Sequence, residues 1–483
     1  MSKFTNKQIN IILPILLFAL AFITKFMFID SRDICVDEPF TIFNAQKSVL
    51  EIIKLPTQNE PNPPLFMLFL HWWMSLFGSS ALSVRILPLL FNSATAVALF
   101  FIGKQLKDKW AGVLTSLIFI LSTYHFYFGM ETRAYSMLSF GTSLGLFAFL
   151  KLIENPESRK NVILLIVANF IIMYSHYFGL FALFAQFVIG IMHYKNKVFF
   201  KKIIIALITS AVLFVPMAIV FIGHFLKFTE GTVVRPPKWI FYIDELIYFT
   251  NGSFSMIGVL LVVLFGWLIK RLKYSTEEKK NLKIIVMWWI VPFTAMFLIS
   301  FKLPMFANRY VLFHTIGFFA TIGLLVSMGK MSKNYRIIAS LIVLVAIGAR
   351  LRVNSKKFFY REVKNAVEKV KELKDENTLV VIHPAWANVG FMYYYSPEIF
   401  QDLEGFNEKQ SLDNILPVYN KQMVQDHLKA NPRYKRVVYY QDGSLFIDPK
   451  NSIKTYLKNE FTFQDSVFYP QCFFVSKFDL EQE

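Results

Sequence analysis

Two adjacent carboxylates, Asp37 and Glu38, are the first residues of this sequence that could carry acid–base chemistry. They stand in DICVDEPFTIFNA, a few residues after the first long apolar run. A carboxylate near a membrane surface can act as a general base or can position an acceptor hydroxyl or amine. A solvated pair of loop carboxylates without a catalytic role is the plainer alternative, and these two residues alone leave both interpretations open.

A second group follows in the segment ETRAY, where Glu131, Arg133 and Tyr135 lie between two apolar runs. An acid and an arginine near membrane depth are costly unless they are paired or functional. The planar guanidinium of arginine suits phosphate recognition. The alternative is a structural ion pair between Glu131 and Arg133 that locks the loop, and the two interpretations do not exclude each other.

A third group is Arg309 and Tyr310, which open a later apolar run after the short segment KLPMFA. The alternative to a phosphate site is a snorkelling anchor at the membrane boundary. His176, between two further tyrosines, is typical of an interface residue more than of a catalyst. Arg85 lies at the outer end of a span, and Arg235 and Lys238, in the connection 225–252, could meet a phosphate or lipid headgroups.

These acids and arginines come from segments far apart in the sequence, and the topology derived below places them on one face. A cavity there could hold a lipid-phosphate donor, with arginines on the phosphate and a carboxylate on the acceptor. Breaking a sugar–phosphate bond requires stabilisation of charge on the leaving phosphate and a base for the attacking hydroxyl or amine.

Apolar helices must position these groups, because 55% of the 483 residues are hydrophobic, only 17% are charged, and the mean hydropathy is +0.45. Runs of 17–25 apolar residues are long enough to cross a bilayer. The first run has no small-residue cleavage site after it, which predicts an uncleaved span. The predicted spans are 10–29, 82–103, 110–128, 134–151, 161–176, 177–194, 203–224, 253–269, 284–301, 309–329 and 337–353.

The net charge of +18 follows from topology and requires no nucleic-acid partner. Residues 354–483 contain 17 of the 51 basic residues and 18 of the 33 acidic residues. Residues 1–353 therefore contain 34 basic and 15 acidic residues. The excess sits in alternate short connections, as the positive-inside rule expects. With a cytoplasmic N-terminus, eleven spans place every basic connection in the cytoplasm and the C-terminal tail outside.

The apolar segment 63–78 is too short to count as a span, and counting it would invert the downstream topology. We therefore expect a helix in the outer interface, with His71, Trp72 and Trp73 at headgroup depth, which tryptophan favours. Residues 30–81 then form one large outer loop.

The tail changes character and indicates a small extracytoplasmic α/β domain. Residues 359–374 and 421–430 have helical periodicity, and 377–384 and 433–440 are rich in strand-forming residues. The predicted fold class is thus a polytopic α-helical membrane domain, residues 1–353, followed by an α/β domain, residues 354–483.

The chain has two cysteines, Cys35 and Cys472, and no CxxC pair. Two thiols exclude a zinc–thiolate site by count. A disulfide between them is open in an oxidising compartment.

In four pieces taken in order, the sequence resembles the GT-C superfamily of membrane glycosyltransferases. The nearest branches are bacterial relatives of the protein O-mannosyltransferases and of the lipid A aminoarabinose transferases. The pieces are VDEPF (36–40), NPPLFMLFLHWW (62–73) followed by Arg85, METRAYS (130–136) and NRYVLF (308–313).

The resemblance implies an inverting transfer of a sugar from a polyprenyl-phosphate donor to an acceptor outside the bacterial cell (inner) membrane. It implies that Asp37 is the base or the acceptor-positioning group, with Glu38 beside it. The donor-phosphate side would comprise Glu131, Arg133, Arg309 and Tyr310, and the acceptor side or pocket Asn62, His71, Tyr135 and Arg85. The acceptor could be a glycolipid, a polysaccharide or a protein. A divalent metal ion is left open, because its use varies among such enzymes.

Two other functions compete with sugar transfer. A transporter or flippase of a lipid-linked glycan would have broken helices and binding groups near the bilayer midplane. The middles of these spans are nearly free of ionisable residues. A membrane scaffold would leave Asp37, Glu38, Glu131 and Arg133 without a role.

Overall fold

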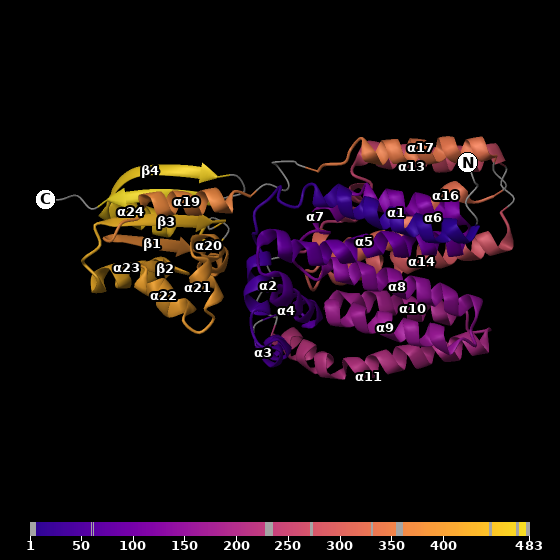
Figure 1. Cartoon of the computed structure of the whole chain (residues 1–483), viewed down its shortest axis with the longest axis horizontal. Coiled ribbons are helices and arrows are strands. Elements are labelled where there is room, and N and C mark those ends of the chain that lie inside the picture. Colours follow the sequence, from indigo (N-terminus) through magenta and orange to yellow (C-terminus); the bar gives the residue numbers. More distant parts are fainter. Residues whose placement is uncertain are drawn as a thin grey trace. The chain divides into compact units, whose positions relative to one another are not determined.

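The computed structural model describes residues 6–58, 60, 62–227, 235–270, 274–329, 332–353, 361–443, 447–469 and 473–479 (Figure 1). The chain divides into two compact units. The helical unit comprises residues 1–28, 50–69 and 83–353, and the α/β unit comprises 29–49, 70–82 and 354–483. The predicted outer loop 30–81 is therefore shared between the two units.

Every predicted span contains a helix, although 110–128 is divided between α6 and the short α7. In chain order the helices up to residue 353 are α1 (Asn6–Phe26), α2 (Glu38–Ala45), α3 (Val49–Lys54), η1 (Leu55–Thr57), α4 (Leu65–Phe77), α5 (Ala81–Leu106), α6 (Lys109–Ile120), α7 (Thr123–Tyr127), α8 (Tyr135–Glu154), α9 (Arg159–Ser175), η2 (Tyr177–Gly179), α10 (Leu180–Met192), α11 (Lys197–Lys227), α12 (Ile240–Phe249), α13 (Ser253–Lys270), α14 (Thr276–Ile299), α15 (Asn308–Val311), η4 (Leu312–His314), α16 (Thr315–Ser327) and α17 (Lys333–Gly348).

Six of the described helical stretches are long and apolar enough to cross a membrane. A seventh is added if α12 and α13, which meet at a 77° bend, form one broken span. A multi-pass helical protein is thereby confirmed, whereas the number eleven stays a prediction. The segment 63–78 is helical as expected, and its helix α4 has 13 residues, which is short for a span.

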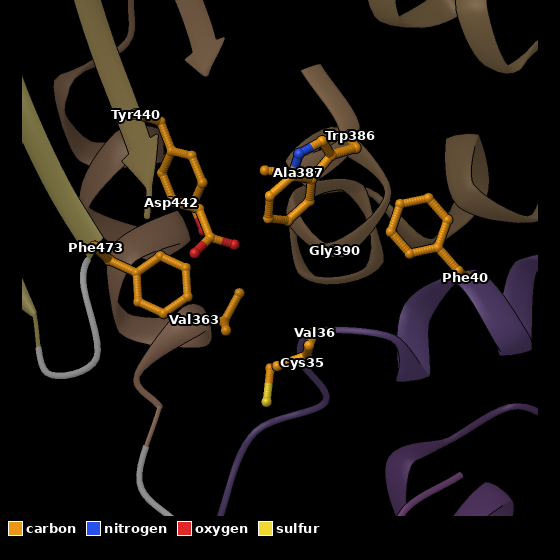
Figure 2. A pocket seen from close by; sticks show the side chains of 10 residues that line it. All are labelled: Cys35, Val36, Phe40, Val363, Trp386, Ala387, Gly390, Tyr440, Asp442 and Phe473. Atoms are coloured by element: carbon orange, nitrogen blue, oxygen red, sulfur yellow. The ribbon is translucent and has the colours of Figure 1, made fainter. Parts of the chain in front are cut away.

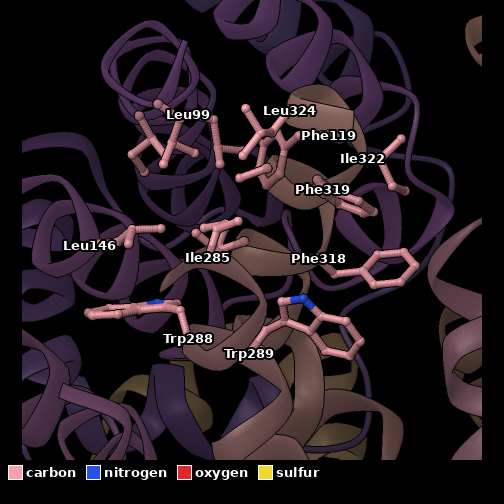
Figure 3. Close-up of a cluster of buried hydrophobic side chains, with 14 of the residues drawn as sticks. Leu99, Phe119, Leu146, Ile285, Trp288, Trp289, Phe318, Phe319, Ile322 and Leu324 are labelled. Atoms are coloured by element: carbon pink, nitrogen blue, oxygen red, sulfur yellow. The ribbon is translucent and has the colours of Figure 1, made fainter. Parts of the chain in front are cut away.

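Aromatic and aliphatic side chains fill the core of the helical unit, with Trp289 of α14 against Phe318 of α16 (Figure 3). Small residues allow some helices to approach closely. A Cβ on Gly323 of α16 would overlap Oγ1 of Thr115 in α6. Larger residues cannot occupy position 323 without separating these helices.

The basic connections lie together at one end of the bundle. The Lys107 ammonium lies 2.6 Å from the Glu278 carboxylate, and the Arg336 guanidinium lies 2.5 Å from Asp108. The four residues come from three predicted cytoplasmic connections. The sequence-based grouping is thus consistent with the packing, and the side of the membrane on which this end lies stays a prediction.

The α/β unit contains a five-stranded sheet in the order β2-β1-β3-β5-β4. β1 pairs in parallel with β2 and β3, and β5 pairs antiparallel with β3 and β4. The strands are β1 (Thr378–His383), β2 (Ile415–Pro417), β3 (Arg436–Asp442), β4 (Thr462–Tyr469) and β5 (Phe473–Asp479). Its helices beyond residue 361 are α19 (Val363–Leu373), η5 (Ala385–Ala387), α20 (Asn388–Tyr395), α21 (Pro397–Gln401), α22 (Phe406–Leu412), α23 (Lys421–Ala430) and α24 (Ser452–Glu460).

The predicted α/β fold of the tail is confirmed. All six residues of β1 are buried, because helices cover both faces of this parallel part of the sheet. Leu379 and Val381 pack with Val424 of α23 and Leu457 of α24 on one face. The helix predicted for 359–374 begins at Val363 in the described structure, and residues 354–360 lie outside it.

Candidate active site

A buried histidine in the helical unit is influenced by the charges of two arginines. His176 follows the end of α9 at Ser175, in the break before η2, and its side chain is only 6% exposed. Its Nδ1 accepts a hydrogen bond from the Phe178 N–H at 3.2 Å. The positive charges of Arg133 and Arg309 both act on its imidazole, so two guanidinium groups lie within electrostatic reach of it.

Aromatic rings frame the same histidine. The ring of Tyr310 lies 5.5 Å from that of His176 and 4.9 Å from that of Phe178, and the Tyr135 ring lies 6.1 Å from His176. The Arg309 guanidinium stands 5.0 Å from the centre of the Tyr310 ring. The segments ETRAY and NRY, about 175 residues apart in the sequence, thus meet in space.

Short turns and helix starts fix the backbone around Arg133 and Arg309. The Arg133 N–H donates to the Glu131 carbonyl at 2.6 Å, and α8 begins two residues later at Tyr135. Gly129 closes the preceding turn, because a Cβ there would overlap the His125 carbonyl oxygen. Arg309 stands in the first turn of the short helix α15. Both arginines therefore lie at helix starts, where the chain leaves an irregular segment.

The cluster lies at the end of the helical bundle opposite the basic connections, because α8 runs from one to the other. Tyr135 is the first residue of α8, and Glu154 is its last. The Glu154 carboxylate accepts a hydrogen bond from Gln105 at 2.7 Å, next to the basic connections. Twenty helical residues, about 30 Å, separate the two ends.

Glu60 and Asn62 form a second polar pair in the helical unit. The Asn62 side-chain amide donates to Oε1 of Glu60 at 2.9 Å, and its backbone N–H donates to the same oxygen at 3.3 Å. Glu60 is 8% exposed, and its charge acts on the hydroxyl of Tyr177, the neighbour of His176. The structure thus adds Glu60, a residue of the predicted outer loop 30–81.

The other residues of the helical unit that the sequence suggested for the site differ in their exposure to solvent. Arg85 is fully buried in the first turns of α5, and Glu131 is 6% exposed. Arg235 and Lys238 are exposed, in the segment that leads into α12. The described structure therefore adds no support for a phosphate role of these two exposed residues.

Asp37 and Glu38 belong to the α/β unit, at the start of α2. The Cys35 N–H donates to the Glu38 carboxylate at 3.4 Å, and the Glu38 N–H donates to the Cys35 carbonyl at 3.1 Å. Glu38 is 1% exposed, whereas Asp37 is only partly buried. Of the two acids, Asp37 is therefore the one that a second reactant can reach.

His71 supports the far end of the same helix. Its Nδ1 lies 2.9 Å from the carbonyl oxygen of Ala45, the last residue of α2. This contact gives His71 a structural role within the α/β unit, beside the acceptor-side role that the resemblance implies.

Among the described residues, no three His, Cys, Asp or Glu side chains gather as metal ligands. Cys472 lies outside the described residues, so a disulfide between it and Cys35 stays open. The interface role predicted for His176 stays a prediction, and the structure places this histidine at the break between α9 and η2.

Comparison with known proteins gives a family-model match over part of the chain and a shared fold. Residues 61–222 match the family model of dolichyl-phosphate-mannose-protein mannosyltransferases. No curated protein matches the chain by sequence.

Among solved structures, ArnT from Cupriavidus metallidurans bound to undecaprenyl phosphate is similar, with a TM-score of 0.62 and 10% identity over 96% of this chain and 97% of that one. Its apo structure gives a TM-score of 0.60 with the same identity and coverage. The archaeal oligosaccharyltransferase AglB from Archaeoglobus fulgidus, in complex with an inhibitory peptide and a dolichol-phosphate, gives 0.50 and 9% identity over 99% of this chain and 75% of that one.

The four sequence pieces, the matched segment 61–222 and the likeness over nearly the whole chain agree with one another. The chain thus has the fold of the GT-C membrane glycosyltransferases, and its resemblance to them is confirmed.

Proposed function

We propose that this protein transfers a sugar, with inversion, from a polyprenyl-phosphate donor to an acceptor outside the cytoplasm. The observation that carries the proposal is the meeting of the segments ETRAY and NRY at the buried His176, which brings together the chain segments of Arg133 and Arg309. Two arginines from distant segments make a site for an anion held at a helix-bundle end. The ligands bound in the two similar proteins, undecaprenyl phosphate and dolichol-phosphate, support a lipid phosphate as that anion.

The donor phosphate binds to the two guanidinium groups, and Tyr135 and Tyr310 border it with apolar ring surface. As the sugar–phosphate bond breaks, negative charge grows on the leaving phosphate. The arginines hold the phosphate in the bound donor and balance this charge as it grows.

The acceptor hydroxyl or amine attacks the anomeric carbon from the face opposite the phosphate. The new bond forms as the bond to the phosphate oxygen breaks, and the acceptor proton passes to the Asp37 carboxylate. Asp37 suits the base role because it is the more accessible acid, whereas Glu38 is buried and engaged with the Cys35 backbone. The products are an inverted glycoside and a polyprenyl phosphate.

The proposed orientation places the basic connections in the cytoplasm of a bacterial cell and the arginine cluster outside its inner membrane. The clustering of Lys107, Glu278, Asp108 and Arg336 at one end supports this orientation through the positive-inside rule. The donor sugar and the acceptor class, whether glycolipid, polysaccharide or protein, are for experiment to decide.

A lipid-linked glycan flippase is the second candidate, and one observation favours it. α12 and α13 meet at a 77° bend, and broken helices are a feature of transporters. Asn251 at this break has φ 68° and donates to the carbonyls of Leu121 and Ile347 at 2.8 and 2.9 Å, so the bend is held by side-chain hydrogen bonds.

The test is sugar transfer by the purified protein in nanodiscs. Radiolabelled polyprenyl-phosphate sugars serve as donors and cell-envelope extract as acceptor, with EDTA and with added Mg²⁺ or Mn²⁺ in parallel. Label that enters a product supports the proposal, and the EDTA arm decides whether a divalent ion is required. Label that crosses the bilayer without transfer would contradict the proposal and establish the flippase.

A further inference from the structure

The loop that carries Asp37 is part of the α/β unit, and its N-terminal side is anchored there by two hydrogen bonds. The Ile34 N–H donates to the Tyr394 hydroxyl of α20 at 2.6 Å. The Lys364 N–H, in the first turn of α19, donates to the Asp33 carboxylate at 2.8 Å. Asp33 thereby caps a helix that lies some 330 residues further along the chain.

The C-terminal side of the loop is anchored as well. The Phe43 ring of α2 lies 4.8 Å from Phe406 and 5.5 Å from Phe400. The Gln46 side chain donates to the Phe400 carbonyl at 3.3 Å. Anchors from α19, α20, α21 and α22 therefore lie on both sides of Asp37 and Glu38.

Between the anchors, the turn packs against the sheet and α20 (Figure 2). Cys35, Val36 and Phe40 face residues that include Trp386, Tyr440 and Asp442 around a cavity of about 10 Å³. This volume admits about one water molecule and no sugar. The region is thus a joint between the loop and the tail, not a ligand pocket.

The turn itself has a backbone conformation that needs such support. Val36 has φ 57°, a left-handed value that is a genuine outlier for a β-branched residue. Such conformations persist only where the surroundings over-determine them, and they cluster at functional sites. Val36 is the residue directly before Asp37, so its conformation sets the direction in which Asp37 leaves the turn.

We propose that Tyr394 is a positioning residue for sugar transfer, because its hydroxyl holds the Ile34 N–H and so maintains the strained Cys35–Glu38 turn that presents Asp37. This inference rests on the proposed function for its catalytic consequence. Its structural part, that the tail holds the turn, stands on the contacts above.

The test compares Tyr394→Phe with Tyr395→Phe, a matched control on the same helix. Both changes remove one hydroxyl, and that of Tyr395 interacts with Asp413 instead of the loop. We expect Tyr394→Phe to lower kcat about 10- to 100-fold with the donor KM unchanged, since a misplacement near 1 Å costs on this scale. Tyr395→Phe should keep the wild-type kcat.

A second readout does not depend on activity. In a Cys472→Ser background, maleimide labelling of the buried Cys35 should be at least fivefold faster in Tyr394→Phe than in wild type or Tyr395→Phe. Glycine adopts φ 57° without strain, so Val36→Gly added to Tyr394→Phe should restore part of the lost kcat. A general loss of stability would instead be additive in the double variant.

The outcomes separate the two proposals. If the wild type transfers no sugar from any donor, the proposed function fails, and the Cys35 labelling still decides whether the tail holds the turn. If the wild type is active and Tyr394→Phe matches it in kcat and in labelling, the positioning role is overturned. Equal losses in the two tyrosine variants would overturn it as well.

Discussion

The two charged regions of this molecule are built in different ways. The arginines around His176 stand at helix starts within the helical unit, whereas Asp37 and Glu38 stand in a loop that belongs to the α/β unit. The first region offers permanent positive charge, because arginine does not deprotonate in proteins. The second offers carboxylates in a turn that the tail supports. Under the proposed function, the helical unit recognises the lipid phosphate and the α/β unit handles the acceptor.

The largest expected effect is the loss of kcat when Asp37 is replaced. Asp37→Asn should lower kcat about 10²- to 10⁴-fold, the scale of a lost general base, and should leave the donor KM unchanged. Transfer kinetics in nanodiscs measure both constants. Glu404→Gln, a change at an exposed carboxylate of the same unit, is the control. An Asp37→Asn enzyme with wild-type turnover would remove Asp37 from the reaction.

A smaller effect is expected when Arg133 or Arg309 is replaced, and it should change the donor KM instead of kcat. Arg133→Ala and Arg309→Ala should each raise the donor KM about 10- to 100-fold, because a hydrogen bond to a charged group contributes about 1.5–3 kcal/mol. Arg235→Ala, at an exposed arginine, is the matched control. Unchanged donor kinetics in both variants would place the phosphate elsewhere.

A third prediction concerns the stability of the joint between the loop and the tail. Burial raises the pKa of Asp442 to about 6, and the Arg361 guanidinium 3.7 Å away opposes this rise. The usual value for aspartate is 3.8, so stability falls as the pH rises from about 4 to about 6 and is then constant. Asp442→Asn removes this loss of unfolding free energy, which is at most about 3 kcal/mol.

Thermal unfolding at pH 4.5 and pH 7.5 measures this difference. Asp442→Asn should raise the unfolding midpoint at pH 7.5 and have a much smaller effect at pH 4.5. Asp402→Asn is the opposite control, since Lys409 lowers the pKa of Asp402 and its charge stabilises the fold at the higher pH. Equal shifts of the Asp442→Asn midpoint at both pH values would contradict the assignment.

The smallest effect is expected at His176. Its Nδ1 accepts the Phe178 N–H, and no step of the proposed transfer passes a proton to or from the imidazole. His176→Gln keeps a neutral acceptor for the Phe178 N–H and should stay within about threefold of the wild-type kcat, with an unchanged pH profile. Loss of an inflection near pH 6.5 in the variant would show that His176 titrates during the reaction.

The parts of the fold that follow local patterns could be predicted from the sequence. The apolar runs indicated the helices, and the strand-forming residues of 377–384 and 433–440 indicated β1 and β3. β4 escaped prediction because its side chains alternate poorly and its pairing with β5 shifts register between Phe463 and Asp465. The helices α20 and α21 also escaped, because they are too short to show a clear periodicity.

The candidate site could be predicted only in part, because its partners are far apart in the sequence. ETRAY and NRY were visible as motifs, but their meeting at His176 depends on the packing of α8, α9 and α15. Tyr394 stands 360 residues from Ile34, and no local pattern indicates their hydrogen bond. The sharing of residues 30–81 between two units likewise depends on contacts that composition does not encode.

Binding of undecaprenyl phosphate to the protein in nanodiscs is the decisive experiment, because it separates the two charged regions. The arginine cluster is proposed to bind the donor phosphate, whereas Asp37 serves the acceptor. The Arg133→Ala, Arg309→Ala double variant should bind this lipid at least tenfold more weakly than wild type. Asp37→Asn should bind it as wild type does and yet transfer almost no sugar. Wild-type affinity in the double arginine variant would contradict this division of roles.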